Sequence, residues 1–478
     1  MNKLKKYALS SLYDMASGIS STKEQAGHGS PFVSFSTVFN NYFLPDELPD
    51  LMETSKKEQE VYSIKKGDIL ITRTSETIDE LAMSCVATKD YPCATYSGFT
   101  KRLRPKTEGI AYYKYMAFYL RSDWFRKAVT NNAFMTLRAS FNEDIFSFLN
   151  VYLPDYDVQV RIGDFLYSIE QRISVNKRIC AELESLAKTI YDYWFTQFDF
   201  PDADGKPYRS SGGAMEWKEQ LKRKIPLGWK VAPLSTVIAG INTGLNPRDN
   251  FVLGKGDIQY LTVKNLTTAG TVDFSGCDTI DEEARAIIHR RSDISIGDIL
   301  FASIAPLGRC YLIQSTPENW DINESVFSIR GNSEYVTPEF LYMYFMSDTF
   351  IKGATSSSTG SIFKGIRINT LLDMVAVIPP KHIAEAFSAQ IKDMLALKAQ
   401  KSEENMELTK LRDWLLPMLM NGQATVADDE EEISKVIPFA PQTVEVRQAA
   451  RNFGDKETDD TADLVKAFMR RKKNDSEA

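Results

Sequence analysis

The sequence predicts an α+β protein: two homologous mixed α/β domains separated by two long antiparallel coiled-coil helices, with a pseudo-two-fold internal repeat. Three observations support this prediction. The phrase Gly-Asp-Ile-Leu occurs at 67–70 and again at 297–300. Leu9-Ser10-Ser11 matches Leu234-Ser235-Thr236, and other matches share this shift in residue number, which we call the repeat offset. Each copy is followed by a long stretch with a heptad pattern of apolar residues.

The first domain is predicted over residues 1–154 and the second over 230–379. The segment FLNVYLP at 148–154 matches DMVAVIP at 373–379, again at the repeat offset. The spacing is slightly wider at the Gly-Asp-Ile-Leu phrase and then returns, as expected of small loop insertions with compensating deletions. An apolar pair after a Gly-Asp turn predicts a buried strand, so the phrase belongs to a shared scaffold.

The two long helices are predicted over 155–197 and 380–422. In each, apolar residues follow steps of three and four, which is typical of a coiled coil. Each apolar run of about 36 residues would be roughly 54 Å long as a helix. Both seams are polar at the centre, and we expect Arg172 or Asn176 to face Lys401 or Glu404. The predicted seam consists of Ile162, Ile169, Arg172, Asn176, Leu183, Ile190, Phe387, Met394, Lys401, Leu408 and Leu415. The alternative is that each helix simply packs its apolar face on a globular core.

Two further segments complete the chain. Residues 198–229 are rich in Pro, Gly, Ser and Asp, which predicts a loop-like linker. Residues 423–478 form a charged tail without periodicity, for which we expect a flexible appendage with a short helix at 462–472.

Composition narrows the class of protein. No run of 18 apolar residues occurs, the N-terminus lacks the apolar core of a signal peptide, and the five cysteines are scattered. We therefore expect a cytoplasmic protein. The net charge of −7 does not exclude nucleic acid, because a mildly acidic chain can carry a local basic face.

The sequence carries no catalytic motif that we recognise. The three histidines are dispersed, and neither a phosphate-binding GxxxxGK[ST] loop nor a GxGxxG motif is present. We expect a binding protein with no catalytic residues, no metal and no cofactor of its own. An enzyme whose site lacks a recognisable motif is the remaining alternative.

Candidate DNA contacts follow from residue type, because Lys and Arg bind phosphates while Arg, Lys, Asn and Ser can read base edges. In the first copy they are Arg73, Thr74, Lys101, Arg102, Arg104, Arg126, Lys127, Asn131 and Arg138. In the second copy they are Lys264, Asn265, Arg290, Arg291, Arg309, Lys352, Ser357, Lys364 and Arg367, with Ser303 in the place of Arg73. For any one of them, a solvated surface charge is the competing interpretation.

The chain resembles the specificity subunit of type I restriction-modification enzymes. The resemblance covers nearly all of residues 5–422 and rests on five groups of motifs taken together. They are FDFPDADGKPYRSSGGAMEW (198–217), IPLGWKV (225–231), the two Gly-Asp-Ile-Leu copies, TGSIFKGIRINTLLDMVAVIPP (359–380) and LRDWLLPMLMNGQ (411–423).

The resemblance implies that each globular copy is a target recognition domain for one half of a bipartite double-stranded DNA site. It implies that the helices set the gap and that two methyltransferase subunits and up to two restriction subunits bind. S-adenosylmethionine, ATP and Mg would then belong to those partner subunits. The tail after about residue 427 lies outside the resemblance, and the first copy lacks a GWKV-type entry. The alternative function is a coiled-coil scaffold with duplicated protein-binding domains.

Overall fold

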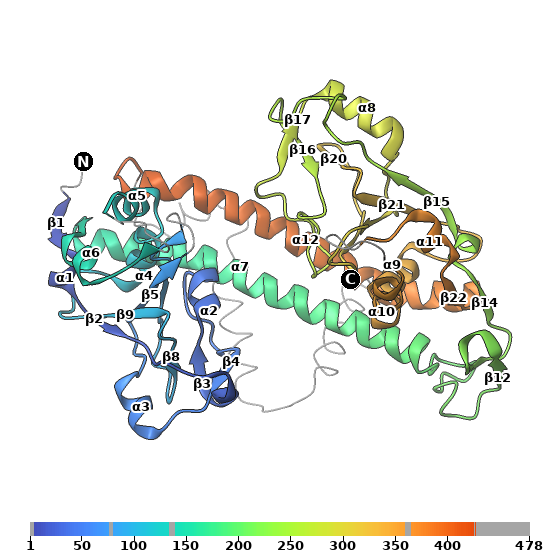
Figure 1. Cartoon of the computed structure of the whole chain (residues 1–478), viewed down its shortest axis with the longest axis horizontal. Coiled ribbons are helices and arrows are strands. Elements are labelled where there is room, and N and C mark those ends of the chain that lie inside the picture. The colour runs from blue at the N-terminus through green and yellow to red at the C-terminus, as the bar shows by residue number, and fades with distance from the viewer. Residues whose placement is uncertain (1–3, 76–79, 133–138, 359–364, 425, 427–478) are drawn as a thin grey trace, which may run out of the picture. The chain divides into compact units, whose positions relative to one another are not determined.

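The computed structural model describes residues 4–75, 80–132, 139–358, 365–424 and 426 (Figure 1). The chain divides into two compact units, one formed by residues 1–166 with 415–478 and the other by residues 167–414. Both units mix helices with small sheets, so the predicted α+β class is confirmed.

The first unit contains three small sheets. Their strand orders are β1-β11, β2-β9-β5-β7 and β4-β3-β8, and a short pair β10-β6 lies apart from them. The strands are β1 (Lys5–Ala8), β2 (Tyr13–Ser17), β3 (Ala26–Val33), β4 (Asp50–Met52), β5 (Ile69–Thr72), β6 (Thr74–Ser75), β7 (Ser84–Val86), β8 (Thr95–Tyr96), β9 (Thr100–Pro105), β10 (Ala139–Ser140) and β11 (Asn150–Leu153). The helices are α1 (Leu9–Leu12), α2 (Phe35–Asn40), α3 (Lys56–Val61), α4 (Tyr113–Tyr119), α5 (Asp123–Asn132) and α6 (Glu143–Phe148).

The second unit repeats this plan. Its sheets have the orders β14-β22, β15-β21-β18-β19 and β17-β16-β20, with a separate hairpin β12-β13. The strands are β12 (Met215–Lys218), β13 (Arg223–Pro226), β14 (Lys230–Pro233), β15 (Ile238–Thr243), β16 (Ile258–Leu261), β17 (Asp278–Ile280), β18 (Ile299–Ala302), β19 (Cys310–Leu312), β20 (Trp320–Ile322), β21 (Val326–Gly331) and β22 (Val375–Ile378). The helices are α8 (Glu282–Ser292), α9 (Pro338–Met346), α10 (Asp348–Ser357) and α11 (Ile368–Asp373).

The internal repeat is therefore present in three dimensions as well as in the sequence. In each copy a four-stranded antiparallel sheet has the same order, and a three-stranded sheet has one parallel pair, β3 with β8 or β16 with β20. Helices α5 and α10 begin at Asp123 and Asp348, and strands β11 and β22 begin at Asn150 and Val375. Both pairs of starting residues are separated by the repeat offset that the sequence shows.

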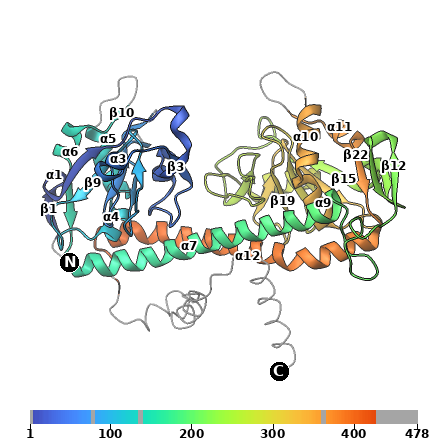
Figure 2. The ribbon, with the colours of Figure 1, turned by 90° about the horizontal axis from the view of Figure 1, so that it is seen from below.

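The two long helices are α7 (Tyr156–Tyr191), which a π-helical turn extends over Asp192–Thr196, and α12 (Lys381–Met420). Within the second unit they are antiparallel neighbours, because Glu170 pairs with Arg412 whereas Glu184, farther along α7, pairs with Lys398 (Figure 2). The predicted antiparallel pairing of two long helices is confirmed over this stretch.

The buried face of the helices is broader than the seam expected from the sequence. Ile162, Ile169, Phe387 and Leu408 of that seam are buried, while Leu183, Ile190, Met394 and Leu415 are half-buried. Residues outside the seam, including Ile173, Ile391, Leu395 and Lys398, are also buried. The reason is that both helices contribute to the core of the second unit, where Tyr191 and Phe387 pack against Phe195.

The segment 198–229 is folded, contrary to the expected loop. Strands β12 and β13 form a hairpin, and the Trp229 ring centre lies 5.5 Å from that of Phe198 and 5.2 Å from that of Phe200. The many Gly and Pro residues indicate turns, but they do not reveal that Phe198, Phe200 and Trp229 are buried. The tail from 427 onwards, including the expected helix at 462–472, lies outside the described residues.

Over the described ranges, no helix combines the length and the apolar character that crossing a bilayer requires.

Candidate nucleic-acid interface

The repeated Gly-Asp turn holds a buried carboxylate that pairs with an arginine in each domain. Gly67 and Gly297 have φ values of 86° and 89°, a conformation that favours glycine. The next residue, Asp68 or Asp298, is at most 1% exposed. Arg104 donates hydrogen bonds of 2.8 and 2.6 Å to Asp68, and Arg330 donates two bonds of 2.7 Å to Asp298. The hydrogen bonds from Arg330 to Asp298 raise the pKa of its guanidinium. The turn is thus a structural device, and Arg104 is part of it.

Two further basic candidates of the first domain also hold the fold together. Arg102 is 9% exposed and donates a 2.6 Å hydrogen bond to the carbonyl of Ser63. Arg126 donates to the carbonyl of Leu81. Arg102 and Arg126 thus donate to backbone carbonyls, and Arg104 donates to the Asp68 carboxylate. Because their guanidinium groups are already hydrogen-bonded within the domain, these three arginines are not part of the proposed DNA interface.

Asn265 and Arg309 of the second domain have similar roles. Asn265 is buried, accepts a hydrogen bond from the amide of Thr262 and donates one to the carbonyl of Asp273, both 2.9 Å long. Arg309 is half-buried and donates to the carbonyl of Val263 at 3.4 Å. Asn265 therefore shapes its loop, which leaves Lys264 next to it as the exposed basic residue.

Nine candidates have exposed side chains, as a contact with DNA requires. They are Arg73, Lys127, Asn131, Lys264, Arg290, Arg291, Lys352, Ser357 and Arg367. Arg138 and Lys364 lie outside the described residues. Lys127 on α5 and Lys352 on α10 occupy equivalent positions in the two copies, since both helices follow the repeat offset.

The position after the buried strand is where the two copies differ in chemistry. The amide of Phe141 donates to the carbonyl of Arg73 at 2.8 Å, and the amide of Ile366 donates to the carbonyl of Ser303 at 2.8 Å. These matching bonds place Arg73 and Ser303 at one equivalent site. Arg73 is exposed, whereas Ser303 is buried and donates through its hydroxyl to the carbonyl of Ser325 at 2.7 Å. At this site the first copy has a long cationic side chain, whereas the second copy has a short side chain that is hydrogen-bonded within the domain.

Phe99 lies beside Arg73 and was not expected from the sequence. The amide of Arg73 donates to the carbonyl of Phe99 at 2.8 Å, and the Phe99 side chain is 62% exposed. Nearby on β9, Lys101 directs its ammonium to the hydroxyl of Ser17 at 3.0 Å. Thr74 pairs with Ser140 across the β6–β10 ladder. An exposed aromatic residue that is hydrogen-bonded through its backbone to an exposed arginine can contact a base, since apolar groups read the thymine methyl.

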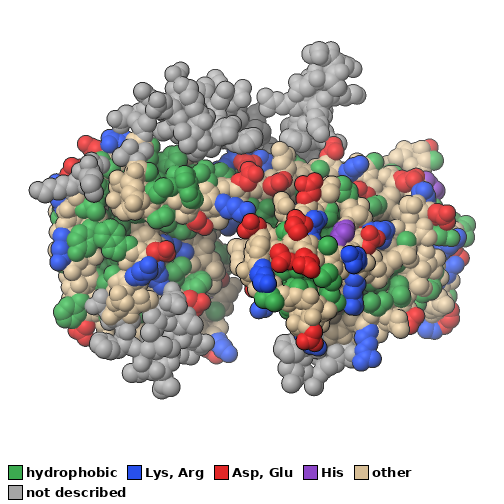
Figure 3. Space-filling view, turned by 90° about the horizontal axis from the view of Figure 1, so that it is seen from above, with side chains coloured by type: hydrophobic (Ala, Val, Ile, Leu, Met, Phe, Trp, Pro, Cys, Tyr) green, Lys and Arg blue, Asp and Glu red, His purple; other side chains and the backbone are tan. Residues whose placement is uncertain are grey.

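In the second domain the candidates fall into separate groups. Arg290 and Arg291 end helix α8, where Arg291 donates to Thr243 on β15 at 3.1 Å. Arg367 immediately follows Ile366, so it lies close to Ser303. On the face drawn in Figure 3, basic and acidic side chains are interspersed over the described residues of this unit. The candidates thus form small basic groups on a mixed surface.

Among the residues that the structure describes, no three His, Cys, Asp or Glu side chains are grouped so as to hold a metal ion.

The first part of the chain matches a known protein family. Residues 3–185 match the family described as the type I restriction modification DNA specificity domain. This stretch contains the whole first domain and most of α7.

Curated specificity subunits are similar to the chain well beyond this specificity domain. The MjaIX specificity subunit of Methanocaldococcus jannaschii is 21% identical over 79% of this chain and 82% of its own length. The HindI specificity subunit of Haemophilus influenzae is 22% identical over 82% of this chain and 94% of its own.

A solved structure shares the fold. The S subunit of a type I restriction-modification system from M. genitalium matches with a TM-score of 0.55 at 16% identity, covering 87% of this chain and 96% of that one. The likeness supports the two-copy fold described above.

Proposed function

We propose that this chain is the DNA sequence-recognition subunit of a type I restriction-modification complex. Each globular domain reads one half of a bipartite double-stranded site, and the paired helices set the unread gap between the halves. The observation that carries the proposal is the duplication itself. One sheet topology occurs twice, within a chain whose residues 3–185 match the specificity-domain family.

The differences between the copies support two reading surfaces with different targets. The buried strands and their Asp–Arg pairs are kept in both domains. The residue after each strand changes from exposed Arg73 to buried Ser303. A guanidinium can bind guanine through two hydrogen bonds, which a buried serine hydroxyl cannot do.

We propose that the DNA contacts are made by the exposed candidates, with Phe99 added to them. Lys127 and Lys352 would contact phosphates from equivalent helices, fixing each domain on the duplex. Arg73 and Asn131 would lie near the bases in the first domain. Lys264, Arg290, Arg291, Ser357 and Arg367 would contact DNA in the second.

We further propose that the chain acts with partners that carry the chemistry. Two methyltransferase subunits would bind S-adenosylmethionine, and up to two restriction subunits would bind ATP and Mg. The chain itself would supply recognition and a scaffold. The names of the relatives, which identify them as specificity subunits of type I restriction enzymes, support the recognition role. The partner subunits and their cofactors are what the resemblance to that family implies.

Footprinting of the assembled complex tests the proposal. The full chain is purified with its methyltransferase partner and incubated with a library of duplexes. We expect two short protected tracts separated by a constant number of unprotected base pairs. Protection that is absent, or equal on all sequences, would contradict DNA recognition and favour the alternative of duplicated protein-binding domains on a helical scaffold.

A further inference from the structure

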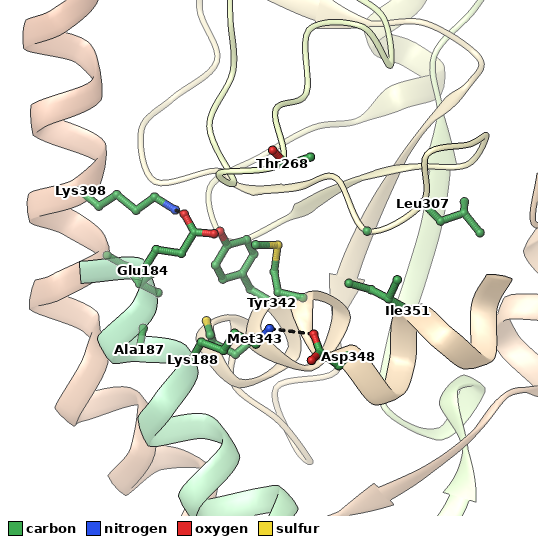
Figure 4. A pocket seen from close by; sticks show the side chains of 13 residues that line it. Glu184, Ala187, Lys188, Thr268, Leu307, Tyr342, Met343, Asp348, Ile351 and Lys398 are labelled. Atoms are coloured by element: carbon green, nitrogen blue, oxygen red, sulfur yellow. Dashed lines mark hydrogen bonds and ion pairs between the residues drawn. The ribbon is translucent and has the colours of Figure 1, made fainter. Parts of the chain in front are cut away.

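Three charged pairs join α7 to α12 within the second unit. Arg172 donates to Glu404 at 2.5 Å, Lys398 donates to Glu184 at 3.0 Å, and Arg412 donates to Glu170. Figure 4 shows Glu184 and Lys398 pointing toward each other from the two helices, beside Tyr342 of α9. These pairs are partly shielded from water: the Lys398 side chain is 5% exposed, those of Arg412 and Glu170 are 12% and 16% exposed, and those of Glu184 and Arg172 are 27% and 31% exposed.

The repeat makes a comparison possible inside this helix pair. Helices α7 and α12 begin at Tyr156 and Lys381, so their equivalent positions are also related by the repeat offset. Each charged pair therefore corresponds to a second pair of facing positions, in which the α7 residue is replaced by its equivalent on α12 and the α12 residue by its equivalent on α7. For Glu170 with Arg412 those positions hold Ala187 and Leu395.

The other two pairs give the same result. The position equivalent to Arg172 with Glu404 holds Ile179 and Leu397. The position equivalent to Glu184 with Lys398 holds Ile173 and Thr409. Every charged pair is therefore matched by an uncharged one, although the helices belong to homologous halves of the chain.

This asymmetry bears on which helices can pair. In an antiparallel pair of two α7 helices with the same register, Glu184 would face Ile173 and Glu170 would face Ala187. In a pair of two α12 helices, Lys398 would face Thr409 and Arg412 would face Leu395. Each buried charge would lose its partner, which is strongly unfavourable.

We infer that the charged pairs form a pairing code: α7 accepts α12 and rejects a second copy of α7, and α12 likewise rejects itself. Apolar seams alone would permit all three pairings, because duplicated helices present similar surfaces. The code keeps one first domain with one second domain in every assembly, including assemblies in which two chains exchange halves. The inference concerns assembly and does not depend on DNA recognition.

Charge reversal in the full-length chain tests the code. One variant reverses α7 (Glu170→Lys with Glu184→Lys), a second reverses α12 (Lys398→Glu with Arg412→Glu), and a third carries all four substitutions. We expect each one-sided variant to lose about 5 °C or more in Tm and the four-substitution variant to recover most of that loss. The third variant has the most substitutions, so its recovery cannot come from a general tolerance to change.

Copurification of differently tagged chains measures selectivity directly. Coexpressed α7-reversed and α12-reversed chains can satisfy their charges only with each other, so they should copurify at least about tenfold more than two wild-type or two α7-reversed chains. The inference is overturned if the four-substitution variant is as unstable as the one-sided variants, or if like chains copurify as well as complementary ones. Neither measurement uses DNA, so its failure is distinguishable from a failure of the proposed function.

Discussion

Arg104 donates two hydrogen bonds to the buried carboxylate of Asp68, and the equivalent Arg330 does the same to Asp298 in the second copy. The shared Gly-Asp-Ile-Leu phrase thus forms a turn and supplies a buried carboxylate, and its arginine partner comes from a distant part of the same domain. Because the same pair recurs, it belongs to the scaffold that both domains need.

Removal of one member of this pair tests its structural role. Arg104→Met leaves Asp68 buried without its cation, so we expect the free energy of unfolding to fall by about 3–5 kcal/mol. Urea denaturation followed by circular dichroism measures the change. Lys89→Met breaks the exposed pair with Asp46 and should cost less than about 1 kcal/mol. Similar losses for both variants would contradict the structural role of the buried pair.

Acid should weaken the helix pair through Glu404. Burial opposes ionisation of this carboxyl, but hydrogen bonds from Arg172 and Lys401 outweigh it and lower its pKa to about 2. A carboxyl whose pKa is lower in the folded state stabilises the protein above its unfolded pKa of about 4.5, and this contribution is lost as the pH falls toward 2. We expect Glu404→Gln to reduce Tm at pH 6 and to show a shallower further decrease between pH 4.5 and pH 3 than the wild type. An unchanged slope would show that Glu404 does not carry this dependence.

Lys127 and Lys352 should contribute to DNA affinity through phosphate contacts. Each change to alanine is expected to weaken binding similarly on all sequences and to reduce the slope of log affinity against log salt by about one. Fluorescence anisotropy of the methyltransferase complex at several salt concentrations measures both effects. Lys89→Ala serves as a matched surface control. A loss confined to one base position would instead indicate base reading.

Helix length should set the gap. Seven residues inserted into both α7 and α12 at positions that face each other add about 10 Å, or about three base pairs of duplex. We expect the matched insertion to lengthen the tolerated gap by that amount. An insertion into α7 alone should separate Glu184 from Lys398 and destabilise the protein. If the tolerated gap does not change with the matched insertion, helix length does not set the distance between the two half-sites.

The sequence predicted the elements of the fold better than it predicted exposure. The offset between Leu9 and Leu234 revealed the duplication, and heptad spacing revealed both long helices. Burial of Arg102 and Asn265 could not be predicted, because it depends on the distant Ser63 carbonyl and on the loop around Asp273. A basic or amide side chain has the same residue type whether it serves a backbone carbonyl or faces solvent.

The candidate interface shows the same division. Arg73 was expected from its place after the Gly-Asp-Ile-Leu strand, and it is exposed there. Phe99 was missed, because exposed aromatic residues resemble core residues in sequence. Only the backbone hydrogen bond from the Arg73 amide shows that the two residues are neighbours. Burial of Phe198, Phe200 and Trp229 was missed for a related reason: long-range packing overrode the turn signals of the segment.

Mapping of methylated adenines tests the central claim most directly. Cells expressing the chain with its methyltransferase partner are compared with cells in which residues 230–379 come from a related specificity subunit. We predict a methylated motif of two short blocks separated by a fixed number of unspecified bases, with only one block altered by the replacement and the gap unchanged. A single continuous motif, or a change in both blocks, would contradict recognition of two half-sites by two independent domains.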